Sequence, residues 1–253
     1  MRSLDMYRRA VGSHALNWYA DPYTGDWDEL NDKGWAYLRR EMLEEPATSI
    51  RLSELPSTSG YDFIYRGRLL DVYGLDATSA VSFFLPTEYM EEHGPGRVRE
   101  LALELAAALP LNSGHAGLCF NFPESVLGTL DAISDLSFRH PGLDIPGVHF
   151  TSLSIGTAVN GVHWLNFLGQ PVLRELEGAA GLRARLRSPG TTVQELNGER
   201  VVVTLGAWPE AGDTELGHTL PAYRELARVL EPWLHLGCFS QESLRRWERR
   251  FLD

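Results

Sequence analysis

A small group of polar residues near the middle of the chain has the side-chain types that nucleophilic enzymes use. His115 precedes Cys119 by four residues, and His163 follows further along the sequence. A cysteine paired with a histidine can support nucleophilic catalysis if the fold joins their side chains. The residues that would complete such a site are Asn121 and either Asp131 or Asp135. This group defines one alternative, a small cytosolic hydrolase or transferase that uses Cys119 with His115 or His163.

The surroundings of these residues favour a structural interpretation. Cys119 lies in an apolar run that is predicted to be a strand, where a free cysteine usually behaves as a small buried hydrophobe. His115 borders glycine residues and is expected to be a hydrogen-bonded loop residue. A zinc site would need a second ligand pair, which the spacing does not offer, and residues 156–161 lack the Lys-Ser/Thr pair of a phosphate loop. We therefore predict a protein that is not an enzyme and has no metal ion or cofactor.

The charge balance indicates the class of partner. The chain has 34 acidic residues against 23 lysines and arginines, which gives a formal charge of −11 at pH 7. A protein that binds nucleic acid or an anionic membrane needs a basic surface, so this balance argues against both. It suits a protein whose partner is itself basic.

Two acidic clusters are the candidate contact sites for such a partner. The first lies in a turn-rich stretch that also holds aromatic residues, and the second follows Pro86. Each cluster has a structural alternative, because carboxylates near a helix start cap the helix or interact with its dipole. The residues predicted to contact the partner are Asp21, Tyr23, Asp26, Trp27, Asp28 and Glu29 in the first cluster and Glu88, Glu91 and Glu92 in the second.

Hydrophobic periodicity predicts the elements that position these residues. Helices are expected on both sides of the turn-rich stretch. The first carries Trp18 at helical spacing and ends at Asp21-Pro22, and the second stops before Pro46. A helix is also expected after the break at residues 94–96. The strands expected in this part of the chain are 50–52, 61–65, 81–85 and 116–122, with 148–155 as a further candidate and a helix at 124–138.

The last hundred residues contain the strongest local signal. Asn197-Gly198 separates two β-rich runs, 191–196 and 199–205, and this dipeptide favours a type I′ hairpin turn. Helices are expected at 170–177 and 179–187, after an N-cap at Thr219, and after an N-cap at Ser240. The final helix is expected to bury Leu244, Trp247 and Phe251 and to keep Arg245, Arg246, Arg249 and Arg250 in water.

The sum of these elements is an α+β protein with mixed, largely antiparallel sheets packed with helices. We expect residues 1–253 to form a single domain. A boundary near residues 75–80 would separate an N-terminal helical part from the main α/β part. No apolar run approaches the roughly 20 residues that cross a bilayer, and the N-terminus lacks the apolar core of a secretory signal. The expected compartment is therefore the cytoplasm.

Several separated motifs resemble those of one known family. They are residues 15–19 (ALNWY), 32–35 (DKGW), 39–41 (RRE), 81–89 (VSFFLPTEY), 94–98 (GPGRV), 111–117 (LNSGHAG) and 247–251 (WERRF). In these segments the chain resembles the type VI secretion system immunity proteins of the TsiV type, formerly a domain of unknown function. The resemblance extends over nearly the whole sequence.

This resemblance implies an antitoxin that neutralises a cognate type VI effector toxin by direct protein–protein contact. The toxin implied is a nuclease of restriction-endonuclease-like fold, and the family implies no catalytic residues. The binding partner would then be a protein, with no nucleic acid or membrane involved, and homodimer formation is left open. Besides the hydrolase or transferase, a third alternative is a structural or assembly subunit of the secretion apparatus.

Overall fold

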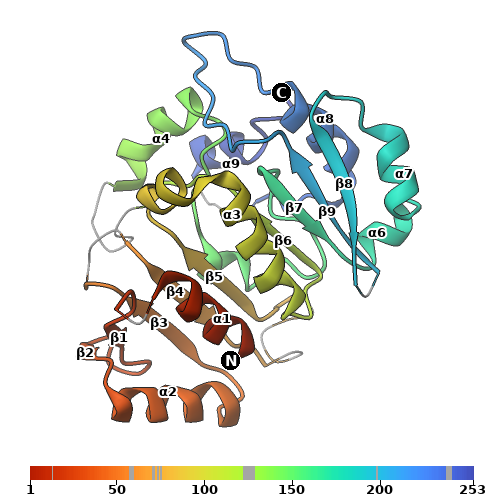
Figure 1. Cartoon of the computed structure of the whole chain (residues 1–253). Helices are drawn as coiled ribbons and strands as arrows, with labels where there is room; N and C mark the ends of the chain where they lie inside the picture. The colour runs from red at the N-terminus through yellow and green to blue at the C-terminus, as the bar shows by residue number, and fades with distance from the viewer. Residues whose placement is uncertain are drawn as a thin grey trace. The chain divides into compact units, whose positions relative to one another are not determined.

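The structure is a computed structural model that describes residues 1–12, 14–56, 60–69, 72, 74, 76–121, 129–197, 199–237 and 241–253. Within these residues the chain forms two compact units. Unit 1 comprises Met1–Leu109 and Gly147–Gly156, and unit 2 comprises Pro110–Pro146 and Thr157–Asp253. Each unit has its own antiparallel sheet packed with helices, which confirms the predicted α+β class (Figure 1). The single domain over residues 1–253 stays a prediction.

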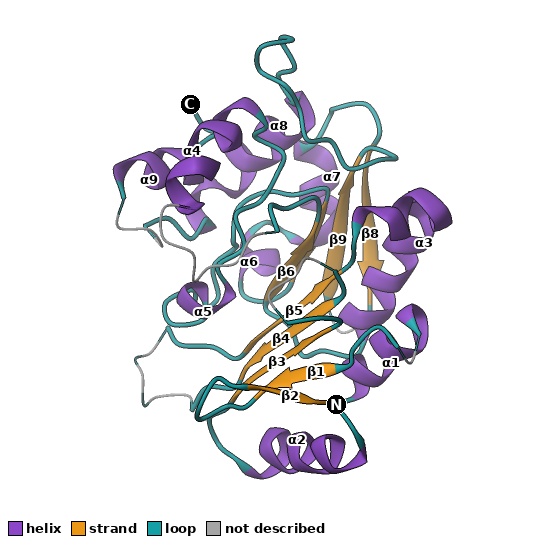
Figure 2. Ribbon diagram, turned by 90° about the vertical axis from the view of Figure 1, so that its left-hand side faces the viewer, coloured by secondary structure: helices purple, strands orange, loops and turns teal. Residues whose placement is uncertain are grey.

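The sheet of unit 1 has the strand order β2-β1-β3-β4-β5, and every neighbouring pair is antiparallel. Its strands are β1 (Trp18–Ala20), β2 (Trp27–Glu29), β3 (Ser49–Ser53), β4 (Asp62–Arg66) and β5 (Ala80–Phe84). Its helices are α1 (Arg2–Val11), α2 (Asp32–Glu44), α3 (Thr87–Ala107) and α5 (Val148–Thr151). Helices α1 and α3 lie side by side against the sheet (Figure 2). The core between helices and sheet contains Leu4, Tyr7, Leu38, Ile50, Leu52, Phe63 and Leu101.

The start of the chain differs from the prediction. The first helix ends at Gly12, whose φ of 95° is a left-handed value that favours glycine. Trp18, predicted to belong to this helix, instead lies in β1 and pairs with Ser53 of β3. Hydrogen bonds to a strand far along the sequence therefore override the local helical spacing. The second helix is confirmed as α2, with the Asn31 side chain capping its N-terminus.

Helix α3 contains the break that the sequence predicts. Gly94 has φ 75° and ψ 162°, which interrupts the helix, and Pro95 starts the second part. The candidate strand at 148–155 is wrong, since Val148–Thr151 form the short helix α5.

The sheet of unit 2 has the order β6-β7-β9-β8, again antiparallel throughout. Its strands are β6 (Ser113–Ala116), β7 (Leu165–Leu168), β8 (Thr191–Leu196) and β9 (Arg200–Leu205). Its helices are α4 (Thr129–Arg139), α6 (Val172–Glu175), α7 (Gly178–Arg185), α8 (Pro221–Leu230), the 3₁₀ turn η1 (Glu231–Trp233) and α9 (Glu242–Glu248). The predicted hairpin is confirmed as β8–β9, although Gly198 lies outside the described residues.

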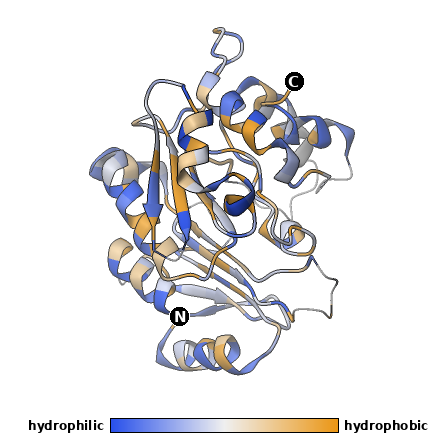
Figure 3. Ribbon diagram, turned by 90° about the vertical axis from the view of Figure 1, so that its right-hand side faces the viewer, coloured by the Kyte–Doolittle hydropathy of each residue, from blue (hydrophilic) through white to orange (hydrophobic). Residues whose placement is uncertain are grey.

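Helix α8 shows why the helical predictions in unit 2 succeed. Tyr223, Leu226, Ala227 and Leu230 recur at helical spacing and are all buried in the unit 2 core. The helices in Figure 3 accordingly change between hydrophobic and hydrophilic colours from turn to turn. The predicted cap at Thr219 is wrong, because Leu220 occupies the N-cap position in a left-handed conformation. Ser240 lies outside the described residues.

The strand predicted at 116–122 is wrong beyond Ala116, because the observed strand β6 is Ser113–Ala116, and Phe122 lies outside the described residues. Strand β6 ends at Ala116, and Cys119 makes only an isolated bridge with Asp144. Of the predicted helix at 124–138, residues 124–128 lie outside the described residues and the rest belongs to α4. Among the helices that the structure describes, none has the length and apolar character needed to cross a membrane.

Candidate functional site

The first acidic cluster forms a β-hairpin at the edge of unit 1. We call residues 21–29 the acidic hairpin. They comprise the turn after β1 and strand β2. In the part of the sheet that the structure describes, β2 is an edge strand and pairs with β1. The Asp21 carboxylate accepts the backbone N–H groups of Tyr23 and Thr24, both at 2.9 Å. These hydrogen bonds lower the pKa of Asp21, and they hold the turn in one conformation.

The hairpin presents most of its predicted contact residues to solvent. Tyr23 is 74% exposed, and its hydroxyl donates a hydrogen bond to Glu41 at 3.2 Å. Asp26, Asp28 and Glu29 are exposed, whereas Trp27 is half-buried. The structure therefore brings the six residues predicted for the first cluster together on one short hairpin.

The second acidic cluster lies at the opposite edge of the same sheet. Glu88, Glu91 and Glu92 are exposed on the first turns of α3, which follows β5. Their spacing places the three carboxylates on one face of the helix. Neighbouring strands lie about 4.8 Å apart, so β2 and β5 are separated by roughly 19 Å. The two clusters are distinct patches that a single large interface could cover.

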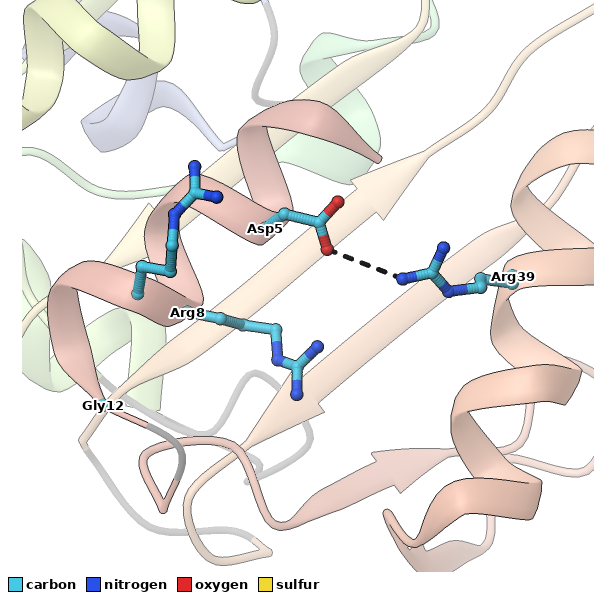
Figure 4. Close-up of a pocket in the computed structure, with 5 residues that line it drawn as sticks. Asp5, Arg8, Gly12 and Arg39 are labelled. Carbon is cyan, nitrogen blue, oxygen red and sulfur yellow. Dashed lines mark ion pairs between the residues drawn. The ribbon is translucent and has the colours of Figure 1, made fainter.

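Unit 1 also contains a basic hollow of about 490 Å³ between α1 and α2. It is lined by Asp5, Arg8, Arg9, Gly12 and Arg39. Figure 4 shows Asp5 and Arg39 pointing toward one another from the two helices, in an ion pair of 3.8 Å. The guanidinium of Arg8 stacks 3.7 Å from the centre of the Trp35 ring. The Asp5–Arg39 ion pair and the contact of Arg8 with Trp35 each join α1 to α2, so we interpret these side chains as structural.

In unit 2 the surroundings of Cys119 do not favour a reactive thiolate. Burial of the thiol, together with the Asp144 carboxylate, raises the pKa of Cys119 to about 12. A thiol with this pKa is almost fully protonated near pH 7 and is a poor nucleophile. Asn121 and Asp135 are exposed, and the side chain of Asp131 lies outside the described residues. The arrangement offers no support for the hydrolase or transferase alternative.

The two histidines of that set do meet. The rings of His115 and His163 stack with their centroids 3.7 Å apart and their planes 14° from parallel. His163 is 1% exposed, and its Nε2 contacts the carbonyl oxygen of Asn160 at 2.8 Å. Asn166 fixes the His163 backbone, since its side chain accepts the His163 N–H at 2.9 Å and donates to the His163 carbonyl at 2.6 Å. Burial lowers the pKa of His163 to about 3, so this ring is neutral near pH 7.

A buried carboxylate completes this group. Asp144 is 8% exposed, and its Oδ2 lies 3.4 Å from Nε2 of His115. Burial opposes ionisation of Asp144, but the basic side chains around it lower the pKa of this carboxyl overall; they are His163, His115 and Arg250. Because His163 is neutral, Arg250 supplies the permanent positive charge that acts on Asp144. Burial lowers the pKa of Arg250 to about 10, which still leaves it charged at pH 7.

His115, Asp144 and His163 are residue types that bind zinc, and their ligand atoms lie within 4.8 Å of one another. Imidazole lone pairs lie in the plane of the ring. In two stacked rings these planes are nearly parallel, so the lone pairs of His115 and His163 do not converge on one ion. The positive charge of Arg250 also opposes a cation here. We interpret the group as an internal charge network that joins β6, the segment around Asp144 and the turn that follows α9, in which Arg250 lies.

Two members of this network could not be recognised in the sequence. Arg250 was expected in water, but it is 8% exposed and its Nε donates to the Pro141 carbonyl at 2.7 Å. Helical spacing places Arg250 close to the inward face defined by Trp247 and Phe251. This spacing is the sequence signal from which its burial could have been predicted. Asp144 lies in a loop without periodicity, and no pattern marks it as buried.

The state of Cys119 can be tested directly. In the Cys238→Ser variant Cys119 is the remaining thiol, because the chain has two cysteines. We expect it to react with a disulfide reagent at pH 8 at least about 100-fold more slowly than free cysteine, because so little thiolate is present. The measurement is the rate of chromophore release, and the same protein unfolded in guanidinium chloride is the control. Fast reaction of the folded protein would contradict the assignment.

The family model "TsiV: Type VI immunity for VRR-NUC" matches residues 1–251. Among solved structures, the T6SS protein PA0821 of Pseudomonas aeruginosa has a similar fold, with a TM-score of 0.81 and 22% sequence identity over 98% of this chain and 77% of that chain. No curated protein matches the chain. The family match confirms the resemblance seen in the sequence: the chain belongs to the TsiV family of type VI immunity proteins.

Proposed function

We propose that this protein neutralises a VRR-NUC nuclease effector of the type VI secretion system by binding it directly, without turning over a substrate. The observation that carries the proposal is the family match over residues 1–251, since the family is described as immunity for VRR-NUC. The formal charge of −11 and the exposed carboxylates of unit 1 support it. The cytoplasm is the compartment in which such an inhibitor would protect DNA.

Elementary electrostatics explains how an acidic protein would inhibit a nuclease. The active cleft of a nuclease is basic because it holds phosphates, so an acidic protein is attracted to it over long range and can cover it. Protection requires that almost no free toxin persists, which corresponds to nanomolar or tighter affinity, or about −12 kcal/mol. Such complexes usually bury roughly 1,200–2,000 Å². Within the proposal, the acidic hairpin and the Glu88 cluster are contact surfaces.

The proposal is tested by co-expression. The effector encoded by the neighbouring gene should arrest growth when it is produced alone in the cytoplasm, and this protein should restore growth. Purified together, the two proteins should form a stoichiometric complex in which DNA cleavage is lost. Continued killing, or cleavage at full rate in an excess of this protein, would refute the proposal.

The acidic hairpin can be tested by reversing its charge. Changing Asp26, Asp28 and Glu29 together to lysine should slow association with the effector by about tenfold at low salt, because steering by exposed charges accelerates encounter. The variant should also show a shallower dependence of the association rate on salt. Stopped-flow or surface-based binding kinetics between about 25 and 300 mM salt would measure both, because the Debye length shortens severalfold over this range.

The control for this variant has the same change in net charge. Glu177, Glu195 and Glu242 are 77%, 67% and 76% exposed and belong to unit 2. Their replacement by lysine should alter the association rate much less if the hairpin is a local contact. Equal slowing in both triple variants would show that only the overall charge matters and that the hairpin has no special role.

A further inference from the structure

The connection between β9 and α8 is a long loop in unit 2 with unusual surface chemistry. We call residues 206–220 the Trp208 loop. In Figures 1 and 2 part of it extends beyond the helices of its own unit. Trp208 is 54% exposed and Leu216 is 72% exposed. Because Trp208 and Leu216 expose more than half of their surface, they contribute little to the core. Exposed apolar side chains of this size are typical of sites that contact another molecule.

Backbone hydrogen bonds fix this loop to the segment that follows α4. Gly142 donates its N–H to the Ala211 carbonyl at 2.8 Å, and Thr214 donates to the Arg139 carbonyl at 2.9 Å. The ring Nδ1 of His140 lies 2.6 Å from the Gly212 carbonyl oxygen. These three contacts join residues 211–214 of the loop to residues 139–142.

Side chains add a second set of restraints. Arg139 contacts the Asp213 carboxylate at 2.9 Å and the Glu215 carboxylate at 3.0 Å. The other oxygen of Asp213 accepts the backbone N–H of Glu215 at 2.9 Å. At the start of the loop, the indole N–H of Trp164 donates to the Gly206 carbonyl at 3.0 Å. A loop restrained in this way loses little conformational entropy when it binds, which favours affinity.

The charge of the loop indicates its partner. Glu210 and Glu215 are exposed and accompany Trp208 and Leu216 on the same connection. Together with Asp213 they outnumber Arg139, which pairs with Asp213 and Glu215, so an excess of negative charge remains. Tryptophan is enriched among the residues that dominate binding energies, and flanking carboxylates complement a basic surface. We infer that the Trp208 loop is a preformed contact element that packs against the basic surface of the nuclease effector, with Trp208 and Leu216 as its apolar anchors. This inference rests on the proposed function and adds a surface that the acidic clusters do not include.

The experiment compares two double variants that are matched in chemistry and exposure. The first is Trp208→Ala with Leu216→Ala. The control is Phe150→Ala with Leu43→Ala, since Phe150 and Leu43 are 56% and 70% exposed on other elements. The probe is the effector encoded by the neighbouring gene, carrying an inactivating substitution. Affinity and dissociation rate are measured by titration calorimetry and surface-based kinetics, and circular dichroism checks that each variant folds.

We expect the loop variant to bind the effector at least about 100-fold more weakly, mainly through faster dissociation, and the control variant to bind within about threefold of the wild type. Wild-type binding with no difference between the loop variant and the control would overturn the inference and leave the proposed function intact. A greater loss in the control variant would also overturn it. If the wild-type protein fails to bind the effector, the proposed function itself fails.

Discussion

Replacing Arg250 with methionine is expected to lower the free energy of unfolding by about 3–5 kcal/mol, because it removes a buried positive charge that favours the ionised Asp144 carboxylate and leaves that carboxylate uncompensated. Asp144 would stay buried beside His115 without its permanent positive neighbour. The Pro141 carbonyl would lose the donor that lies 2.7 Å away, and the Trp247 ring would lose the guanidinium stacked 3.7 Å from its centre. Equilibrium unfolding in guanidinium chloride measures the change.

Two further variants make this result specific. Arg245→Met, in helix α9 shortly before Arg250, removes a surface ion pair with Glu242. The side chains of Arg245 and Glu242 are 52% and 76% exposed, so this change should cost less than about 1 kcal/mol. Adding Asp144→Asn to Arg250→Met should cost clearly less than the sum of the two single changes, because the two charges interact. Equal effects of Arg250→Met and Arg245→Met, or strict additivity in the cycle, would show that the network contributes no charge compensation.

Replacing Gly142 with alanine is expected to destabilise unit 2 by about 2–3 kcal/mol, the cost of forcing extra atoms into a packed site. A Cβ on Gly142 would lie 1.9 Å from the carbonyl oxygen of Glu210 and 3.0 Å from that of Ala211. Both are backbone atoms, so the Trp208 loop itself would have to move. The same change should weaken binding of the effector, since the loop would lose its restrained conformation.

Gly96→Ala is the matched control for this substitution. Gly96 lies in α3, and a Cβ there meets nothing within 4 Å. Alanine should therefore leave stability unchanged or raise it by about 0.4–1 kcal/mol, because it restricts the unfolded chain. Thermal and chemical unfolding would measure the stability of both variants. Comparing them distinguishes the steric clash expected at Gly142 from a general effect of adding a methyl group. Similar stabilities of the two variants would contradict the packing described here.

The sequence predicted those parts of the fold in which local signals and tertiary packing agree. The β8–β9 hairpin follows from Asn197-Gly198 between β-rich runs, and α8 follows from apolar residues at helical spacing. The prediction at Trp18 was wrong because pairing with β3 decides its conformation, and helical spacing carries no information about a partner strand more than thirty residues away. The segment at 148–155 was misassigned as a strand, whereas Val148–Thr151 form the helix α5 through local backbone hydrogen bonds.

Of the candidate sites, the sequence identified the exposed acidic residues but not the buried or loop residues. Exposed acidic residues were identified by composition, and the structure gathers those of the first cluster on one hairpin. The role of Arg250 was missed because a charged residue near the end of a terminal helix is normally solvated, and the buried Asp144 carboxylate that partly compensates its charge is not marked in the sequence. The Trp208 loop was missed as well, since exposure of an aromatic side chain depends on tertiary structure.

Strand β2 has a consequence for the behaviour of the protein at high concentration. An open sheet edge can pair with the edge of another molecule, and natural proteins prevent this with short strands and charged side chains. Strand β2 has three residues, and two of them are exposed carboxylates. The same groups that we propose to attract a basic toxin would therefore guard against self-association into aggregates. Lysine at these positions preserves that protection, so the charge-reversed hairpin should stay in solution and its binding can be measured without interference from precipitation.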